Sequence, residues 1–185
     1  GRIDADALVA LALILVMAAA VFSARRAREA RAVRDELAEQ ARYDALTGLP
    51  NRLYLSEWLG GELTASRRAG TRVAVLFVDV DRFKLVNDTH GHEVGDALLV
   101  ALADRLRSCV DDPADRVVRL AGDEFVVVCH DDPLRPRATI RLARRIVSVL
   151  EEPFEVGRES LRVAASIGVA VSTPRGGPED LLRDA

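Results

Sequence analysis

The chain has 185 residues, of which 49% are hydrophobic and 30% charged, and its formal net charge is −3 at pH 7. This slightly acidic balance excludes a broad basic surface, so we expect no nucleic-acid partner. The cysteines (Cys109 and Cys129) form no CxxC pattern and the histidines have no zinc-site spacing, which excludes a disulfide scaffold and a zinc module and predicts reduced, structural thiols.

The first predicted element is a transmembrane helix over residues 1–24. An uncharged apolar run extends from Ala7 to Phe22, and with its small flanking residues it approaches the roughly 20 residues that span a bilayer. Aspartates precede the run and arginines follow it, so the positive-inside rule places the C-terminal side in the cytoplasm. We therefore expect a single-pass protein of the inner (cytoplasmic) membrane with a cytoplasmic catalytic domain.

Two alternatives to the membrane helix are open. Phe22-Ser23-Ala24 resembles a signal-peptide cleavage site, but a signal peptide carries its positive charge before the apolar run and not after it. A buried helix of a soluble protein is disfavoured because every face of the run is apolar.

Residues 25–42 form a predicted helical linker, rich in Ala, Arg and Glu and free of Gly and Pro. Ala30, Val33, Leu37 and Ala41 alternate at three- and four-residue spacing, which is typical of a short coiled-coil seam. Such a helix could form a homodimer. The alternative is a plain solvated linker, because one or two heptads are too few to decide.

Residues 43–185 have the length of one globular domain. Its predicted elements alternate between helices and strands, which gives an α/β fold in which helices sandwich a palm-like mixed sheet. The predicted order is a helix at Arg52–Ala69, a strand at Val73–Asp79, helices at Arg82–Asp88 and Val94–Cys109, an acidic hairpin, a helix at Arg137–Leu150, a small hairpin from Phe154, and a strand at Val163–Val171.

The acidic hairpin carries the clearest chemical signal. Gly122, Asp123 and Glu124 lie between two apolar runs, and adjacent acids at a tight turn repel each other unless a cation is present. Upstream, the apolar strand ends in Asp79-Val80-Asp81. If the hairpin lies beside this strand, Asp79 and Asp123 can converge on Mg²⁺ or Mn²⁺, as nucleotidyl transfer requires.

The alternative is that these strand-end aspartates cap the following helix, since Asp is a favoured N-cap. For Asp81 we expect the capping role, whereas for Asp79 together with Asp123 we favour the metal.

The chain resembles the GGDEF domain family of diguanylate cyclases, which condense two GTP into cyclic di-GMP. The resemblance extends from about Tyr43 almost to the end of the chain. It rests on Asp44–Arg52 (DALTGLPNR), Asp79–Lys84 (DVDRFK), Asn87-Asp88, Gly91-His92, Gly95-Asp96, Ala121–Phe125 (AGDEF) and Ala165–Ala170 (ASIGVA).

The resemblance implies a role for each matching position. Asp79, the carbonyl of Val80 and Asp123 would hold the metal, and Glu124 would act at the 3′-hydroxyl as base or as ligand of a second metal. Asn87 and Asp96 would read the guanine edge, and Phe83 and Lys84 would line the phosphates. The family also implies a dimer, because each domain brings one GTP. The alternative is a non-catalytic, GTP-binding regulatory module, possibly attached to a downstream phosphodiesterase domain.

The sequence departs from the family pattern at three places. Ala121 replaces the first glycine of the motif, and alanine resists positive φ, so we expect reduced or normal activity. Asp112 replaces the Arg of the inhibitory Arg-x-x-Asp product site that ends at Asp115, which predicts no feedback inhibition through that site. The domain as given lacks the family's C-terminal helix with its phosphate-binding Lys and Arg, so we expect weak GTP binding and slow turnover.

Overall fold

The computed structural model describes residues 39–131 and 138–185, together with isolated positions between residues 17 and 37. The chain divides into two units, Gly1–Ala41 and Arg42–Ala185, and the second contains all of the helices and strands below. Within the described residues, no helix combines the length and the apolar character that a bilayer crossing needs. Most of residues 1–24, for which a transmembrane helix is predicted, fall outside the described residues, and so do Ala30 and Val33 of the linker seam.

The second unit is built on a four-stranded sheet in the order β2-β3-β1-β6. Its strands are β1 (Arg72–Val80), β2 (Arg116–Ala121), β3 (Glu124–Asp131) and β6 (Ala165–Val171). All three pairings are antiparallel, so the predicted mixed sheet is wrong. The helices between β1 and β2 do make these two strands run in the same direction. However, β3 folds back from β2 and inserts between them, so the parallel strands never pair.

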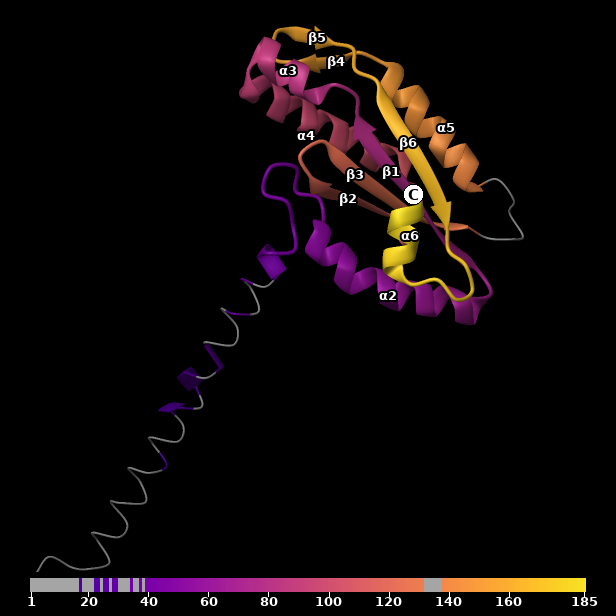
Figure 1. Ribbon diagram of the computed structural model, residues 1–185. Helices are drawn as coiled ribbons and strands as arrows, with labels where there is room; N and C mark the ends of the chain where they lie inside the picture. Colours follow the sequence, from indigo (N-terminus) through magenta and orange to yellow (C-terminus); the bar gives the residue numbers. More distant parts are fainter. Residues whose placement is uncertain are drawn as a thin grey trace, which may run out of the picture. The chain divides into compact units, whose positions relative to one another are not determined.

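Helices cover both faces of the sheet (Figure 1). On one face, α2 (Arg52–Ala69) packs Leu55, Leu59 and Leu63 into a core with alternate residues of the strands. The short α6 (Pro178–Asp184), which the sequence analysis did not predict, contacts this layer too. Gly60 and Gly61 do not interrupt α2, because its buried leucines anchor the helix on both sides of them.

The opposite face carries the larger core. It is covered by α4 (His92–Cys109) and α5 (Ala138–Glu151), with α3 (Phe83–His90) packed on α4. A separate hairpin, β4 (Phe154–Val156) and β5 (Glu159–Leu161), closes this layer. Because alternate residues of β1 enter the two cores, the strand is buried on both faces, as its uninterrupted apolar sequence predicts.

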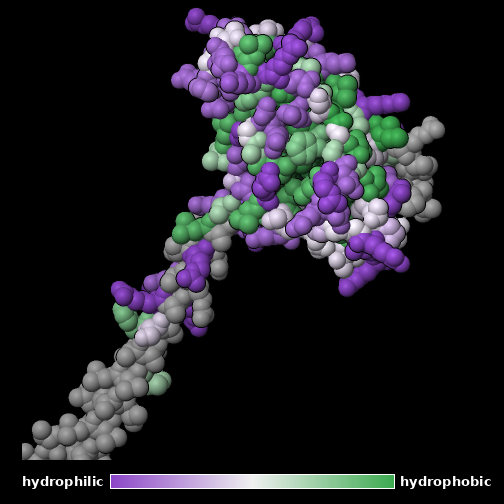
Figure 2. Space-filling model, in the orientation of Figure 1, coloured by the Kyte–Doolittle hydropathy of each residue, from purple (hydrophilic) through white to green (hydrophobic). Residues whose placement is uncertain are grey.

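Among the described strands, β6 forms one edge of the sheet. Ile140 and Val147 of α5 and Val169 of β6 are about half exposed beside a shared groove. Figure 2 shows hydrophobic residues gathered on this side of the domain.

Candidate active site

The acidic turn is a two-residue connection between β2 and β3. Gly122 and Asp123 form it, and Ala121 pairs with Glu124 across its base. Gly122 has a φ of 51°, a left-handed conformation that glycine adopts without strain. Among the described residues, Arg82 alone has a positive φ without being a glycine. Ala121 therefore has no positive φ, although the register of β2 against β3 shifts between Arg119 and Ala121, and the conformational objection to alanine does not apply there.

Arg119 fixes this turn to the loop that opens the domain. Its Nε and Nη2 donate to the carbonyl oxygen of Gly122 at 3.0 and 2.8 Å, and its Nη1 donates to Asp44 Oδ1 at 2.8 Å. The same carboxylate oxygen accepts from the backbone N–H and the hydroxyl of Thr47 at 2.9 and 2.7 Å. Burial acts to raise the pKa of Asp44, but the hydrogen bonds from Thr47 and Arg119 together lower it below its usual value.

This role of Arg119 is not predicted from the sequence. The available signal was an arginine three positions before Gly122, between the apolar pairs Val117-Val118 and Leu120-Ala121. Its bonds reach a residue 75 positions away, and nothing in the sequence indicates that contact.

Asp79 is the penultimate residue of β1 and lies directly opposite Glu124 of β3. Burial raises the pKa of Asp79, and the negative charges of Asp123 and Asp81 raise it further. The structure thus brings Asp79 and Asp123 together, as predicted. Within the described part of the chain, neither carboxylate has an ion-pair partner, so their repulsion is uncompensated by a protein cation.

This donor set fits Mg²⁺ or Mn²⁺. No group of three or more His, Cys, Asp or Glu side chains among the described residues forms a metal site by itself. A magnesium ion needs no such group, because it usually takes one or two carboxylates and completes its shell with water and substrate phosphates. Asp79, Asp123 and the carbonyl of Val80 would supply the protein ligands.

Asp81 does not cap the next helix, and the prediction that it would is wrong. The residue at the N-cap of α3 is Arg82, in a left-handed conformation with φ of 59°, and no side chain caps this end. Asp81 instead accepts a hydrogen bond of 2.7 Å from the hydroxyl of Ser166. The register of β6 against β1 places Ser166 opposite Asp79, within reach of Asp81, and the sequence does not reveal that register.

Phe83 and Lys84 begin α3 just beyond the carboxylates. The Phe83 side chain is buried in the larger core, so it cannot line a phosphate, and only its backbone N–H remains available for that role. Lys84 is exposed. The first turn of a helix has N–H groups without intrahelical partners and favours anions, which suits a phosphate beside the Lys84 ammonium.

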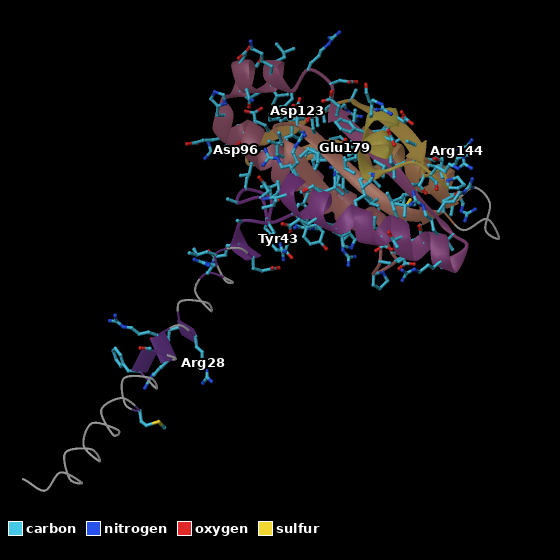
Figure 3. The ribbon with its side chains drawn as sticks, turned by 60° about the horizontal axis from the view of Figure 1, so that its bottom comes forward. Arg28, Tyr43, Asp96, Asp123, Arg144 and Glu179 are labelled. Carbon is cyan, nitrogen blue, oxygen red and sulfur yellow. The ribbon has the colours of Figure 1, made fainter. Side chains whose placement is uncertain are left out.

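Asn87 and Asp96 come from adjacent helices, because α3 and α4 pack on each other. The Asn87 side chain lies against Gly95, the residue before Asp96. Its Oδ1 is buried without a hydrogen-bond partner among the described residues, an orphaned acceptor next to the exposed Asp96. Figure 3 shows Asp96 and Asp123 toward the same end of the domain.

Glu124 is partly exposed, and its nearest cation is Arg52 at the start of α2. The distance from Arg52 Nη2 to Glu124 Oε2 is 3.9 Å, a loose ion pair. Glu124 thus lies beside a basic group while it remains open to solvent. Arg52 belongs to the DALTGLPNR motif, and its position beside Glu124 is not predicted from the sequence.

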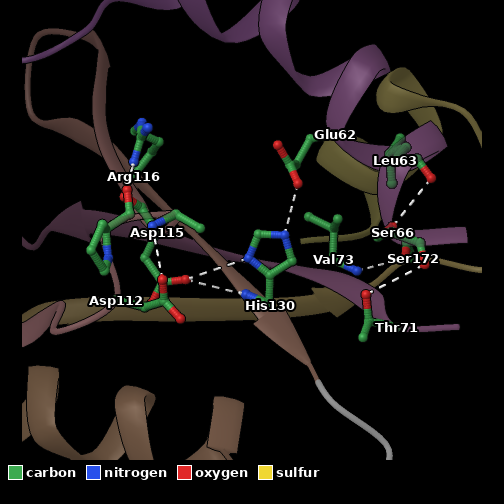
Figure 4. Close-up of polar contacts among 12 residues, drawn as sticks. Glu62, Leu63, Ser66, Thr71, Val73, Asp112, Asp115, Arg116, His130 and Ser172 are labelled. Atoms are coloured by element: carbon green, nitrogen blue, oxygen red, sulfur yellow. Dashed lines mark hydrogen bonds and ion pairs between the residues drawn. The ribbon is translucent and has the colours of Figure 1, made fainter. Parts of the chain in front are cut away.

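A second polar cluster surrounds His130 on the far end of β3 (Figure 4). Its Nε2 lies 2.8 Å from Glu62 Oε1 of α2, and its backbone N–H donates to Asp115 Oδ1 at 3.3 Å. Burial, more than any other effect, raises the pKa of Asp115. Asp112, where the product site of the family would have arginine, accepts instead from the backbone N–H of Ala114 at 2.8 Å.

Residues 41–185 match the family described as diguanylate cyclase, GGDEF domain. The chain is 39% identical over 169 residues to the bifunctional diguanylate cyclase/cyclic di-GMP phosphodiesterase MucR of Pseudomonas aeruginosa, covering 89% of this chain and 24% of MucR. It is 41% identical over 155 residues to the response regulator PleD of Caulobacter vibrioides, covering 82% of this chain and 34% of PleD.

Solved structures give the same result. A sensory box/GGDEF family protein from Caulobacter crescentus superimposes with a TM-score of 0.72 at 38% identity, covering 78% of this chain and 92% of that structure. The chain thus spans about a quarter of MucR, a third of PleD and 92% of the Caulobacter crescentus structure.

Proposed function

Since the chain belongs to the GGDEF domain family of diguanylate cyclases, we propose that it condenses two GTP molecules into cyclic di-GMP, with Mg²⁺ or Mn²⁺ and as a dimer. The observation that carries this proposal is the convergence of Asp79, Asp123 and Glu124. Asp79 and Asp123, which have no ion-pair partner among the described residues, lie near Glu124 at the end of the sheet. These three carboxylates are a donor set for metal-assisted nucleotidyl transfer.

Each side chain has a part in this reaction. Asp79, Asp123 and the Val80 carbonyl would hold the metal ion, which would supply charge neutralisation at the phosphate oxygens. Glu124, opposite Asp79, takes up the proton of the 3′-hydroxyl or helps to bind a second ion. Lys84 and the first backbone N–H groups of α3 neutralise the outer phosphates.

The base is selected by Asn87 and Asp96. The Asp96 carboxylate accepts from the N1 and N2 donors of guanine, and the Asn87 amide can both donate and accept. The buried, unsatisfied Oδ1 of Asn87 supports this assignment, because orphaned polar atoms are rare in native structures and indicate function.

A dimer is part of the proposal because one domain offers one such set of residues, whereas the product joins two nucleotides. The linker over residues 25–42 would hold the two domains together. The sequence also supports attachment to the inner membrane through residues 1–24. Sedimentation of the native protein with membranes, and its release by detergent but not by high salt, would test that attachment.

A second candidate function is a non-catalytic module that binds GTP and regulates a neighbouring domain. It is favoured by the likeness to MucR, whose name includes a phosphodiesterase. The intact acids favour catalysis, since binding alone does not require Glu124.

Incubation of the protein with GTP and Mg²⁺, followed by chromatography and mass spectrometry, tests the proposal. We expect cyclic di-GMP from GTP and no cyclic dinucleotide from ATP. GTP binding without any product, in a protein that is demonstrably dimeric, would contradict catalysis and support the regulatory module.

A further inference from the structure

Gly95 lies inside α4 at the point where Asn87 of α3 packs on it. A Cβ atom added to Gly95 would lie 1.8 Å from Asn87 Oδ1, 3.0 Å from Asn87 Cγ and 3.3 Å from Phe83 Cζ. Real Cβ atoms do not approach neighbours as closely as the first of these distances. The Asn87 amide therefore occupies the volume that any side chain at residue 95 would need.

Helix propensity gives no reason for this glycine. Alanine is favoured over glycine inside a helix, and Gly95 is buried within α4 with no positive φ. The glycine is thus explained by the close approach of Asn87 and not by a need of the backbone. The approach also leaves Asn87 Oδ1 buried without a partner, so the arrangement costs free energy in the isolated domain.

We propose that Gly95 is the positioning residue for base selection: the space that it leaves holds the Asn87 amide flat on α4, beside the Asp96 carboxylate. The amide nitrogen of Asn87 and the Asp96 carboxylate then face the guanine edge as one rigid unit, while Oδ1 stays packed on Gly95. Gly95 touches no substrate in this account and acts only through Asn87. The inference rests on the proposed function, because it assumes that Asn87 and Asp96 read guanine.

The test compares Gly95→Ala, Asn87→Ala and the double variant. The probes are 3′-deoxy-GTP and 3′-deoxy-ATP, which lack the attacking hydroxyl and so report binding without turnover; titration calorimetry in Mg²⁺ gives their affinities. We expect Gly95→Ala to weaken 3′-deoxy-GTP binding about tenfold or more, with little change for 3′-deoxy-ATP. With GTP as substrate, KM should rise while kcat changes much less.

The double variant distinguishes positioning from a general structural effect. If Gly95 acts through Asn87, adding Gly95→Ala to Asn87→Ala should cause no further loss, so that the two effects are not additive. Gly61→Ala is the matched control, because Gly61 also lies inside a helix and a Cβ there meets nothing within 4 Å. This control should bind both probes like the unchanged protein.

Additive effects, or a Gly95→Ala variant with unchanged preference for the guanine probe, would overturn the inference and leave the proposed function standing. An unchanged protein without any preference for the guanine probe would overturn the proposed function and the inference with it. If Gly95→Ala does not fold, the double variant decides. Recovered folding without guanine preference supports the inference, and a double variant that also fails to fold overturns it.

Discussion

At the scale of single residues, Asp79 determines how the site responds to pH. Its pKa is raised above the ordinary 3.8 by burial first and then by the charges of Asp123 and Asp81. A carboxyl group with a raised folded-state pKa stabilises the fold fully below its unfolded-state pKa, where it is protonated. That contribution is lost as the pH rises through the higher, folded-state value. At neutral pH Asp79 therefore destabilises the metal-free domain.

Asp79→Asn should raise the melting temperature at neutral pH without metal, and the difference from the unchanged protein should disappear when Asp79 is protonated in acid. Added Mg²⁺ or Mn²⁺ should stabilise the unchanged protein and have little effect on the variant. Thermal unfolding followed by circular dichroism, with and without metal, measures both effects. Equal stabilisation of the two proteins by metal would contradict the role of Asp79 as a ligand.

The structure gives no conformational reason for Ala121 to lower activity, contrary to what the sequence motif suggests. It is exposed, it ends β2 and it has no positive φ, so restoring glycine relieves no left-handed backbone strain. We expect Ala121→Gly to change kcat/KM by less than about threefold, the kinetic equivalent of an ordinary surface substitution. An increase of a hundredfold in a steady-state assay would show that the methyl group itself obstructs the nucleotide.

At the scale of secondary-structure elements, the acidic turn depends on the loop at residues 44–51. Arg119 donates to the Gly122 carbonyl and to Asp44, and its side chain is 10% exposed. The turn is thereby fixed to the segment that directly follows the linker. The loop makes a second contact with β2, because the carbonyl oxygen of Pro50 accepts a hydrogen bond from the backbone N–H of Arg119 at 2.9 Å.

Arg119→Met should release the turn and leave the Asp44 carboxylate without its cation. Because hydrogen bonds to charged groups contribute about 1.5–3 kcal/mol each, we expect a loss of roughly that size in the free energy of unfolding. Activity should fall more steeply than stability, since the ligand Asp123 is in the turn. Urea titration and a product assay at a temperature where the variant is folded measure the two losses.

Arg158→Met is the matched control, because Arg158 is exposed in the β4–β5 turn. It should change neither stability nor activity. A loss of stability in Arg119→Met with full activity would show that the turn keeps its geometry without the hydrogen bonds from Arg119.

At the scale of the whole molecule, periodicity in the sequence predicted most elements to within a few residues. The leucines of α4 and the apolar run of β1 specify these elements locally. The seven-residue α6 was missed because it is too short to show a helical period. The antiparallel sheet was missed because strand order depends on β3 inserting between β2 and β1, which no local pattern records.

In the candidate site too, some residues could be predicted from local sequence and others depend on the folded chain. Asp79, Asp123 and Glu124 were predictable because they lie at the ends of recognisable strands. Asp81, Arg119 and Gly95 were not, since their partners are Ser166, Asp44 and Asn87, and only the folded chain brings these side chains together.

The predicted linker seam can be tested with engineered thiols. Leu37 is 60% exposed in the single chain, and we expect Leu37→Cys to form a crosslinked dimer under mild oxidation. Cys109 and Cys129 should not interfere, because both are buried and burial raises both thiol pKa values, that of Cys129 to about 12. Glu39→Cys, off the seam, should crosslink far less on a non-reducing gel; equal crosslinking would argue for a plain solvated linker.

The most direct test of the central claim is the rate of cyclic di-GMP formation by Glu124→Gln, measured alongside its affinity for 3′-deoxy-GTP. The substitution keeps the size of the side chain and removes its charge. We predict that turnover is lost, by about a hundredfold or more as for a missing general base, while nucleotide affinity stays close to that of the unchanged protein. Glu152→Gln, an exposed change after α5, should leave both unaffected. A Glu124→Gln protein that makes cyclic di-GMP at the full rate would contradict the account.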